Sequence, residues 1–182
     1  MKAIKIIVIS IVAIVVLIFI VLLIVSRIYE GDFFFLAPSY RKVDRFTIAN
    51  INELSYVANA LSELDYDSIV IRKEPLDEKG KYNMTVSHEY LVYETISIPS
   101  ELVGHIQNLY ENGVEVISCG NDSVNFTIWS IMDESRGIIF TKSGKKPDGE
   151  QLYEVRELST ENWYYYVHNY EKAKEKNPGI FK

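Results

Sequence analysis

The amino-acid sequence predicts an α+β protein in which an N-terminal transmembrane helix is followed by one domain with two helices packed on a mostly antiparallel sheet. Three observations lead to this prediction. Residues 6–25 form an apolar run without a charged residue, two later stretches repeat apolar side chains every three or four residues, and apolar and polar side chains alternate from Val114 onward. The alternation is typical of antiparallel strands joined by short turns, so the sheet is expected to end in a β-meander.

The run from Ile6 to Val25 contains no charged residue, and Ser10 is its only polar side chain. Because a helix rises about 1.5 Å per residue, a run of this length spans the roughly 30 Å hydrocarbon core of a bilayer. A cleaved signal peptide fits less well, since bulky side chains occupy the exit of the run at residues 23–25, where a signal peptidase requires small ones. The lipid bilayer is therefore the first expected partner, through residues 6–25.

The charged residues beside this run predict its orientation. Lys2 and Lys5 precede the run, whereas Arg27 alone follows it before the acidic Glu30. Positive charge is retained on the cytoplasmic side of a membrane. Residues 1–5 are therefore expected in the cytoplasm, and the C-terminal domain is expected outside a single-pass anchor in the cell membrane.

The composition argues against nucleic acid as a partner. The part of the chain after position 27 carries 25 acidic and 16 basic residues, a net charge of −9 against −6 for the whole chain. Nucleic acids and anionic lipid surfaces select basic proteins. The single cysteine, Cys119, excludes an intramolecular disulfide. Exported domains without disulfides, and a heavy use of Ile, Lys, Asn and Tyr, are typical of bacteria, particularly of the Gram-positive type.

The exported part is expected to form one domain over residues 45–172, joined to the anchor by a juxtamembrane segment over 26–44 and followed by a flexible tail over 173–182. About 150 residues can bury a single core, so the length gives no reason to expect a second domain. Two interpretations remain open for the aromatic segment 33–36, which lies either at the outer membrane interface or in the first piece of the core. Residues 143–150, rich in Gly, Lys and Asp, are expected to form an exposed loop.

Two helices are predicted in the domain. The first covers residues 51–64, with Asn50 as its N-terminal cap and Glu53 as the partner in a capping box. The second begins at Ser100, which is expected to cap it, and ends before Gly113, where a left-handed C-terminal cap belongs. The apolar side chains that recur at helical spacing in these two segments are Ile51, Leu54, Ala58, Leu61, Leu102, Ile106 and Leu109.

Strands are predicted before, between and after these helices. Residues 45–48 are expected to be extended. A strand over 67–73 is expected to pair with a second strand over 82–86 as a hairpin, because both alternate apolar with polar side chains. Extension is expected to continue over 88–98, with an irregular break near Glu94.

No motif in the sequence predicts catalysis, a cofactor or a metal site. Cys119 could act as a nucleophile beside His88, His105 or His168, but no spacing supports such a pair, and a lone cysteine in an apolar strand is usually a small core residue. The three histidines are too far apart in the sequence to form a recognisable metal-binding motif. Whether the protein is an enzyme stays undecided, although the balance favours a non-enzyme.

The last predicted strand carries the strongest candidate for a functional surface. Successive side chains of a strand point to opposite faces, and helices cover only one face of the predicted sheet. Aromatic side chains on the uncovered face would offer rigid contact area to a partner. The alternative is that tyrosines stack across neighbouring strands and only stabilise the sheet. The predicted interaction surface consists of Tyr164, Tyr166, His168 and Trp129, and the opposite face carries Trp163, Tyr165 and Val167.

Together these features predict a membrane-anchored extracytoplasmic domain that binds a protein partner at the cell envelope. The partner could be a component of an envelope assembly, or a toxin that an immunity-type protein neutralises. Two alternatives remain open, an envelope enzyme with an unfamiliar site and a cell-wall glycan-binding module that uses the aromatic side chains.

Overall fold

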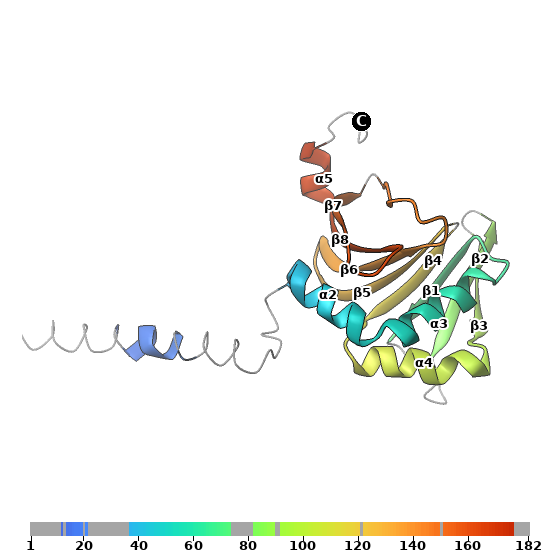
Figure 1. The fold of residues 1–182 in the computed structure, drawn as a ribbon, viewed down its shortest axis with the longest axis horizontal. Coiled ribbons are helices and arrows are strands. Elements are labelled where there is room, and N and C mark those ends of the chain that lie inside the picture. Colours follow the sequence, from blue (N-terminus) through green and yellow to red (C-terminus); the bar gives the residue numbers. More distant parts are fainter. Residues whose placement is uncertain are drawn as a thin grey trace, which may run out of the picture. The chain divides into compact units, whose positions relative to one another are not determined.

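The computed structural model describes residues 12, 14–19, 21, 37–73, 82–89, 92–120, 122–149 and 151–176. The chain divides into two units, Met1–Leu36 and Ala37–Lys182. In the first unit residues 12, 14–19 and 21 are helical (Figure 1). Within the part of the chain that the structure describes, none of the helices has the length and apolar character needed to cross a membrane. The predicted cytoplasmic residues 1–5, most of the apolar run 6–25, the aromatic segment 33–36 and the end of the predicted tail lie outside the described residues.

The second unit contains an antiparallel sheet with the strand order β3-β2-β1-β4-β5-β6-β8-β7. Its strands are β1 Ser68–Arg72, β2 Asn83–Glu89, β3 Val92–Ser97, β4 Val116–Gly120, β5 Ser123–Ile131, β6 Glu134–Thr141, β7 Leu152–Glu157 and β8 Trp163–Asn169. The helices are α2 Tyr40–Ala49, α3 Ile51–Ser62, α4 Ser100–Glu111 and α5 Tyr170–Lys176. Helices α2, α3 and α4 lie on one face of the sheet (Figure 1), so the predicted α+β class is confirmed.

Helix α2 was not predicted from the sequence. Residues 45–48, expected to be extended, are its last turns. The helix begins after Ser39, whose side chain accepts a hydrogen bond from the backbone N–H of Lys42, and it buries Val43 and Thr47 one turn apart. Burial of side chains at this spacing favours a helix over the extended conformation that was expected for residues 45–48. The expected domain boundary at residue 45 falls inside α2.

The caps of α3 and α4 also differ from the prediction. Asn50 makes no side-chain cap, because its amide donates back to the carbonyl oxygen of Phe46 in α2 at 2.9 Å. Glu53 instead shares a hydrogen bond with His105 of α4. At α4 no side-chain cap is present, and Pro99 occupies the N-cap position. The C-terminal prediction is confirmed, since Gly113 has a φ of 105°.

The hairpin of β1 and β2 forms as predicted, with Ile69 opposite Val86. Strand β3 pairs antiparallel with β2, and the register shifts between the pair Val86–Glu94 and the pair Glu89–Val92, so the irregularity predicted near Glu94 is present. Alternate apolar side chains of β1 and β2 are buried in the main core on the helical side of the sheet, namely Ile69, Ile71, Met84 and Val86.

The end of the sheet is not the simple meander that the sequence predicted. Strands β4, β5 and β6 are consecutive neighbours, but β6 pairs with β8, and β7 forms the outer edge. Phe140 at the end of β6 pairs with Trp163, whereas Leu152 at the start of β7 pairs with His168 at the opposite end of β8. The connecting segment, residues 142–151, therefore has to travel back along β8.

Candidate ligand-binding groove

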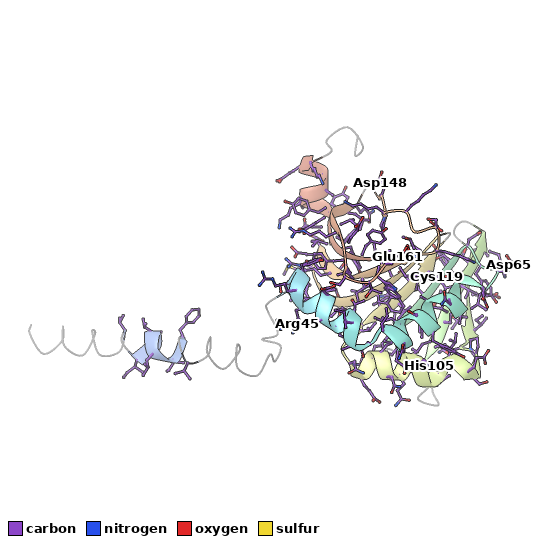
Figure 2. All side chains as sticks on the ribbon, viewed as in Figure 1. Arg45, Asp65, His105, Cys119, Asp148 and Glu161 are labelled. Atoms are coloured by element: carbon purple, nitrogen blue, oxygen red, sulfur yellow. The ribbon has the colours of Figure 1, made fainter. Side chains whose placement is uncertain are left out.

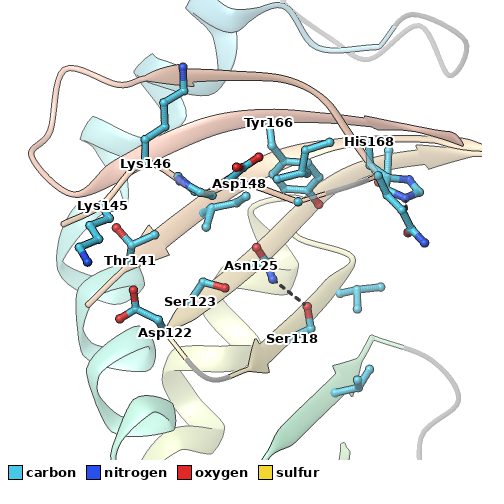
Figure 3. A pocket seen from close by; sticks show the side chains of 18 of the residues that line it. Ser118, Asp122, Ser123, Asn125, Thr141, Lys145, Lys146, Asp148, Tyr166 and His168 are labelled. Atoms are coloured by element: carbon cyan, nitrogen blue, oxygen red, sulfur yellow. Dashed lines mark hydrogen bonds between the residues drawn. The ribbon is translucent and has the colours of Figure 1, made fainter. Parts of the chain in front are cut away.

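The helix-free face of the sheet carries rows of small polar side chains. Side chains on directly paired residues of antiparallel strands lie next to each other on the same face. Ser123 of β5 pairs with Thr141 of β6, and Asn125 of β5 pairs with Ser118 of β4 on one side and with Ile139 of β6 on the other. The amide of Asn125 donates to the Ser118 hydroxyl at 3.5 Å (Figure 3). Hydroxyl and amide groups therefore lie side by side on this face, next to apolar side chains such as Ile139.

These rows form the floor of a groove of about 1110 Å³, and the segment 142–151 lies beside it (Figure 3). The groove is lined by Val70, Arg72, Val116, Ser118, Asp122, Ser123, Asn125, Ser135, Ile139, Thr141, Lys145, Lys146, Pro147, Asp148, Gly149, Gln151, Leu152, Tyr166 and His168. Most of these residues belong to β-strands, so the floor of the groove is a rigid part of the fold.

The connecting segment is tied to the sheet at its first residues. The carboxylate of Asp122 accepts a hydrogen bond from the backbone N–H of Ser143 at 3.0 Å and another from the Ser143 hydroxyl. The Tyr164 hydroxyl donates to the carbonyl oxygen of Gly144 at 2.8 Å. Gly144 has a φ of 70°, a conformation that glycine adopts without strain. The described part of the segment 143–150, expected from the sequence to be a simple exposed loop, thus contributes residues 145–149 to the lining of the groove.

Gly137 allows Tyr166 to reach across β6. The Tyr166 hydroxyl of β8 lies 2.8 Å from the Thr127 hydroxyl of β5 and shares a hydrogen bond with it. Gly137 of β6 lies between these two residues, because it pairs with Thr127 of β5 on one side and with Tyr166 of β8 on the other. A Cβ atom at this position would lie 2.0 Å from the carbonyl oxygen of Phe126. Burial raises the pKa of Tyr166, so its hydroxyl is protonated at neutral pH.

Thr141 has an unsatisfied hydroxyl in the lining of the groove. Its side chain is 3% exposed, and its Oγ1 atom has no hydrogen-bond partner among the described residues. The comparable buried threonine, Thr47 in α2, donates to the carbonyl oxygen of Val43 at 2.9 Å. A buried hydroxyl without a partner costs free energy, so natural proteins rarely keep one without a reason. A ligand in the groove would supply the missing partner.

The predicted aromatic surface is only partly formed. Tyr164 and Tyr166 lie on the helix-free face as predicted, but they are 4% and 5% exposed and pack with Ile139 in a small second core. The segment 142–151 and β7 cover them, an arrangement that depends on the strand order and is invisible in the sequence. His168 is half-buried, and its Nε2 atom is 2.8 Å from the side-chain oxygen of Gln151. Tyr166 and His168 line the groove, whereas Tyr164 does not.

Trp129 does not lie with these residues. The register between β5 and β6 shifts after Thr127, so that Trp129 pairs with Arg136. Such a bulge moves the side chains that follow it to the other face. The Arg136 guanidinium lies 5.8 Å from the centre of the Trp129 ring and donates to the carbonyl oxygen of Pro38 just before α2. The expectation that Trp129 shares one face with Tyr166 is therefore wrong.

The residues that the sequence pointed to for catalysis are not brought together. Cys119 belongs to the helical side, where its Sγ atom is 3.8 Å from the carbonyl oxygen of Leu61. His105 is paired with Glu53 and stacks on Tyr56, with ring centres 4.0 Å apart. Within the described residues, no group of three or more His, Cys, Asp or Glu side chains could hold a metal ion.

Cys119 is expected to react slowly with thiol reagents. Burial raises the pKa of its thiol to about 11, although Lys142 lowers it slightly. At pH 8.5 roughly half of an ordinary cysteine is thiolate, so folded protein should be alkylated by iodoacetamide about a hundredfold more slowly than a free cysteine. Mass spectrometry of timed samples, with denatured protein as the control, measures both rates. Equal rates would contradict a buried thiol.

The sequence matches no protein-family model, and neither the curated proteins nor the solved structures include one that is significantly similar to it. The groove is therefore the basis for a functional proposal. The groove residues that sequence reasoning missed are Ser118, Ser123, Asn125, Thr141 and Lys145. The signal available was the run of Ser, Thr and Asn at alternate positions of strands β4, β5 and β6.

Proposed function

We propose that the chain is a single-pass membrane protein whose domain outside the membrane binds an extended segment of a protein partner in the groove on the helix-free face. The unsatisfied hydroxyl of Thr141, buried in the lining of this groove, is the observation that carries the proposal. A bound segment would provide the hydrogen bond that this hydroxyl lacks among the described residues.

The described part of the apolar run supports the anchor. Six consecutive apolar side chains, from Ile14 to Phe19, are each between 50% and 64% exposed. Six successive residues occupy every side of a helix, because a turn takes about 3.6 residues. A helix that is apolar on all sides needs an apolar environment, and a bilayer provides one. The basic residues before this run support a cytoplasmic N-terminus and a domain on the outside.

Binding is favoured over catalysis by the chemistry of the groove. Hydroxyl and amide side chains of β4, β5 and β6 line its floor together with apolar ones such as Val70 and Val116, and the one cysteine lies on the other face of the sheet. The buried Tyr166 hydroxyl is hydrogen-bonded to Thr127, and burial raises its pKa. Neither feature provides an activated nucleophile or a general base.

A protein segment is favoured over a small molecule or a glycan. Small-molecule pockets enclose roughly 300–1,000 Å³, and this groove is somewhat larger, at about 1110 Å³, with a lining that mixes polar side chains with apolar ones such as Val70 and Val116. Stacking of sugar rings requires exposed aromatic faces, and Tyr164 and Tyr166 are buried. A polar peptide segment would instead hydrogen-bond to side chains such as Ser118 and Asn125.

Site-specific photo-crosslinking in intact cells tests this function. The crosslinking amino acid replaces Gln151, an exposed residue of the groove, and in the matched control it replaces Tyr56, an exposed residue of α3 on the helical face. The proposal predicts a discrete adduct from position 151 that stays with the membranes after an alkaline wash and is absent from position 56. The absence of an adduct at position 151, or the same adduct from both positions, would refute the proposed function.

A further inference from the structure

One end of the groove gathers hydrogen-bond donors. Thr141 and Ser123 pair across β5 and β6 at this end, and Lys145 lies at the same end in Figure 3. The Thr141 hydroxyl has no partner among the described residues, and Lys145 forms no ion pair with any of them. A group that accepts hydrogen bonds and carries negative charge would satisfy both side chains at once.

The groove also differs in charge from the rest of the domain. The chain after position 27 has a net charge of −9, yet the groove carries three cations, Arg72, Lys145 and Lys146, against two carboxylates. The carboxylate of Asp122 lies at the same end as Thr141 and Lys145 in Figure 3, and each of its two oxygens accepts a hydrogen bond from Ser143. The second carboxylate, Asp148, lies between Lys146 and Tyr166, away from Thr141 (Figure 3).

We propose that the Thr141 end of the groove is a carboxylate subsite that receives an acidic group of the bound segment. This inference rests on the proposed function and specifies the chemistry of the partner. The Thr141 hydroxyl donates to one carboxylate oxygen, and the Lys145 ammonium provides the opposite charge. Lys146 points away from the sheet in Figure 3, so it contributes less. The carboxylate belongs either to an Asp or Glu side chain or to the C-terminus of the segment.

The subsite can be tested with short peptides on the full chain in detergent micelles. The first probe is a hexapeptide of Gly, Ser and Asn with blocked ends and a central Asp. The second probe has Asn in place of this Asp. The third probe has the sequence of the second probe but carries a free C-terminal carboxylate. Methyl NMR of labelled threonines follows binding, with the Thr141 methyl as the reporter and the Thr47 methyl as the control.

A carboxylate-containing peptide is expected to shift the Thr141 signal and to bind about tenfold more tightly than the uncharged peptide. Lys145→Gln should remove this tenfold preference, whereas Lys174→Gln, at an exposed position of α5 outside the groove, should change the affinity less than about twofold. A preference for the first probe identifies an acidic side chain, and a preference for the third identifies a C-terminus.

Equal binding of the charged and uncharged peptides, an unmoved Thr141 signal, or equal effects of the two lysine substitutions would overturn the carboxylate subsite. These results leave the crosslinked adduct at position 151 untouched, so the two proposals fail separately. If position 151 gives no adduct in cells but the peptides still show a preference for carboxylate, the proposal of a protein partner is refuted and the carboxylate subsite is retained.

Discussion

Replacing Gly137 with alanine is expected to lower the free energy of unfolding by about 3 kcal/mol or more. The added Cβ atom would lie 2.0 Å from the carbonyl oxygen of Phe126, a backbone atom that cannot move without distorting β5. The distortion would also separate Tyr166 from Thr127 and open the second core. Urea unfolding followed by tryptophan fluorescence measures the change.

Gly104→Ala is the matched control for this substitution. Gly104 is an exposed residue of α4, and no atom lies within 4 Å of the position that its Cβ would take. Alanine is the better helix former, so this variant should be more stable by about 0.5–1 kcal/mol. The free energy of unfolding is therefore expected to fall for Gly137→Ala and to rise for Gly104→Ala. A Gly137→Ala variant as stable as the parent would contradict the close approach of β5 and β6.

Replacing Thr141 with valine is expected to raise stability and reduce binding together. Valine has nearly the same shape and removes a buried hydroxyl without a partner, so the free energy of unfolding should rise by about 1 kcal/mol. In a domain of this size the melting temperature should rise by roughly 3 °C. Thermal unfolding monitored by circular dichroism measures the shift.

Thr47→Val provides the comparison, because this buried hydroxyl is hydrogen-bonded to Val43. Its loss should lower stability by about 1 kcal/mol. Equal destabilisation by the two substitutions would show that Thr141 already has a partner in the free protein. A gain in stability at Thr141 alone would identify a group that is retained for binding, since functional sites often conflict with optimal stability.

The sequence was sufficient for local structure and for the faces of most strands. Periodicity predicted the helices over 51–64 and after Ser100, and the alternation along β8 correctly separated Tyr164 and Tyr166 from Trp163 and Tyr165. These features depend on neighbours in the chain, which a sequence displays directly.

The groove could not be predicted because it depends on contacts between distant segments. The exchange of β7 and β8 sends residues 142–151 across the helix-free face, and this strand order leaves no local pattern. The single extra residue of the bulge before Trp129 reverses its face. Thr141 resembles any other strand threonine until its neighbours are known.

The yield of the photo-crosslinked adduct at position 151, compared between chains that carry Thr141→Val and Thr47→Val, tests the central claim most directly. Both substitutions remove one buried hydroxyl, but only Thr141 lines the groove. The proposed binding groove predicts a yield at least about fivefold lower for Thr141→Val, as expected for the loss of a buried hydrogen bond, and an unchanged yield for Thr47→Val. Equal yields from the two chains would contradict it.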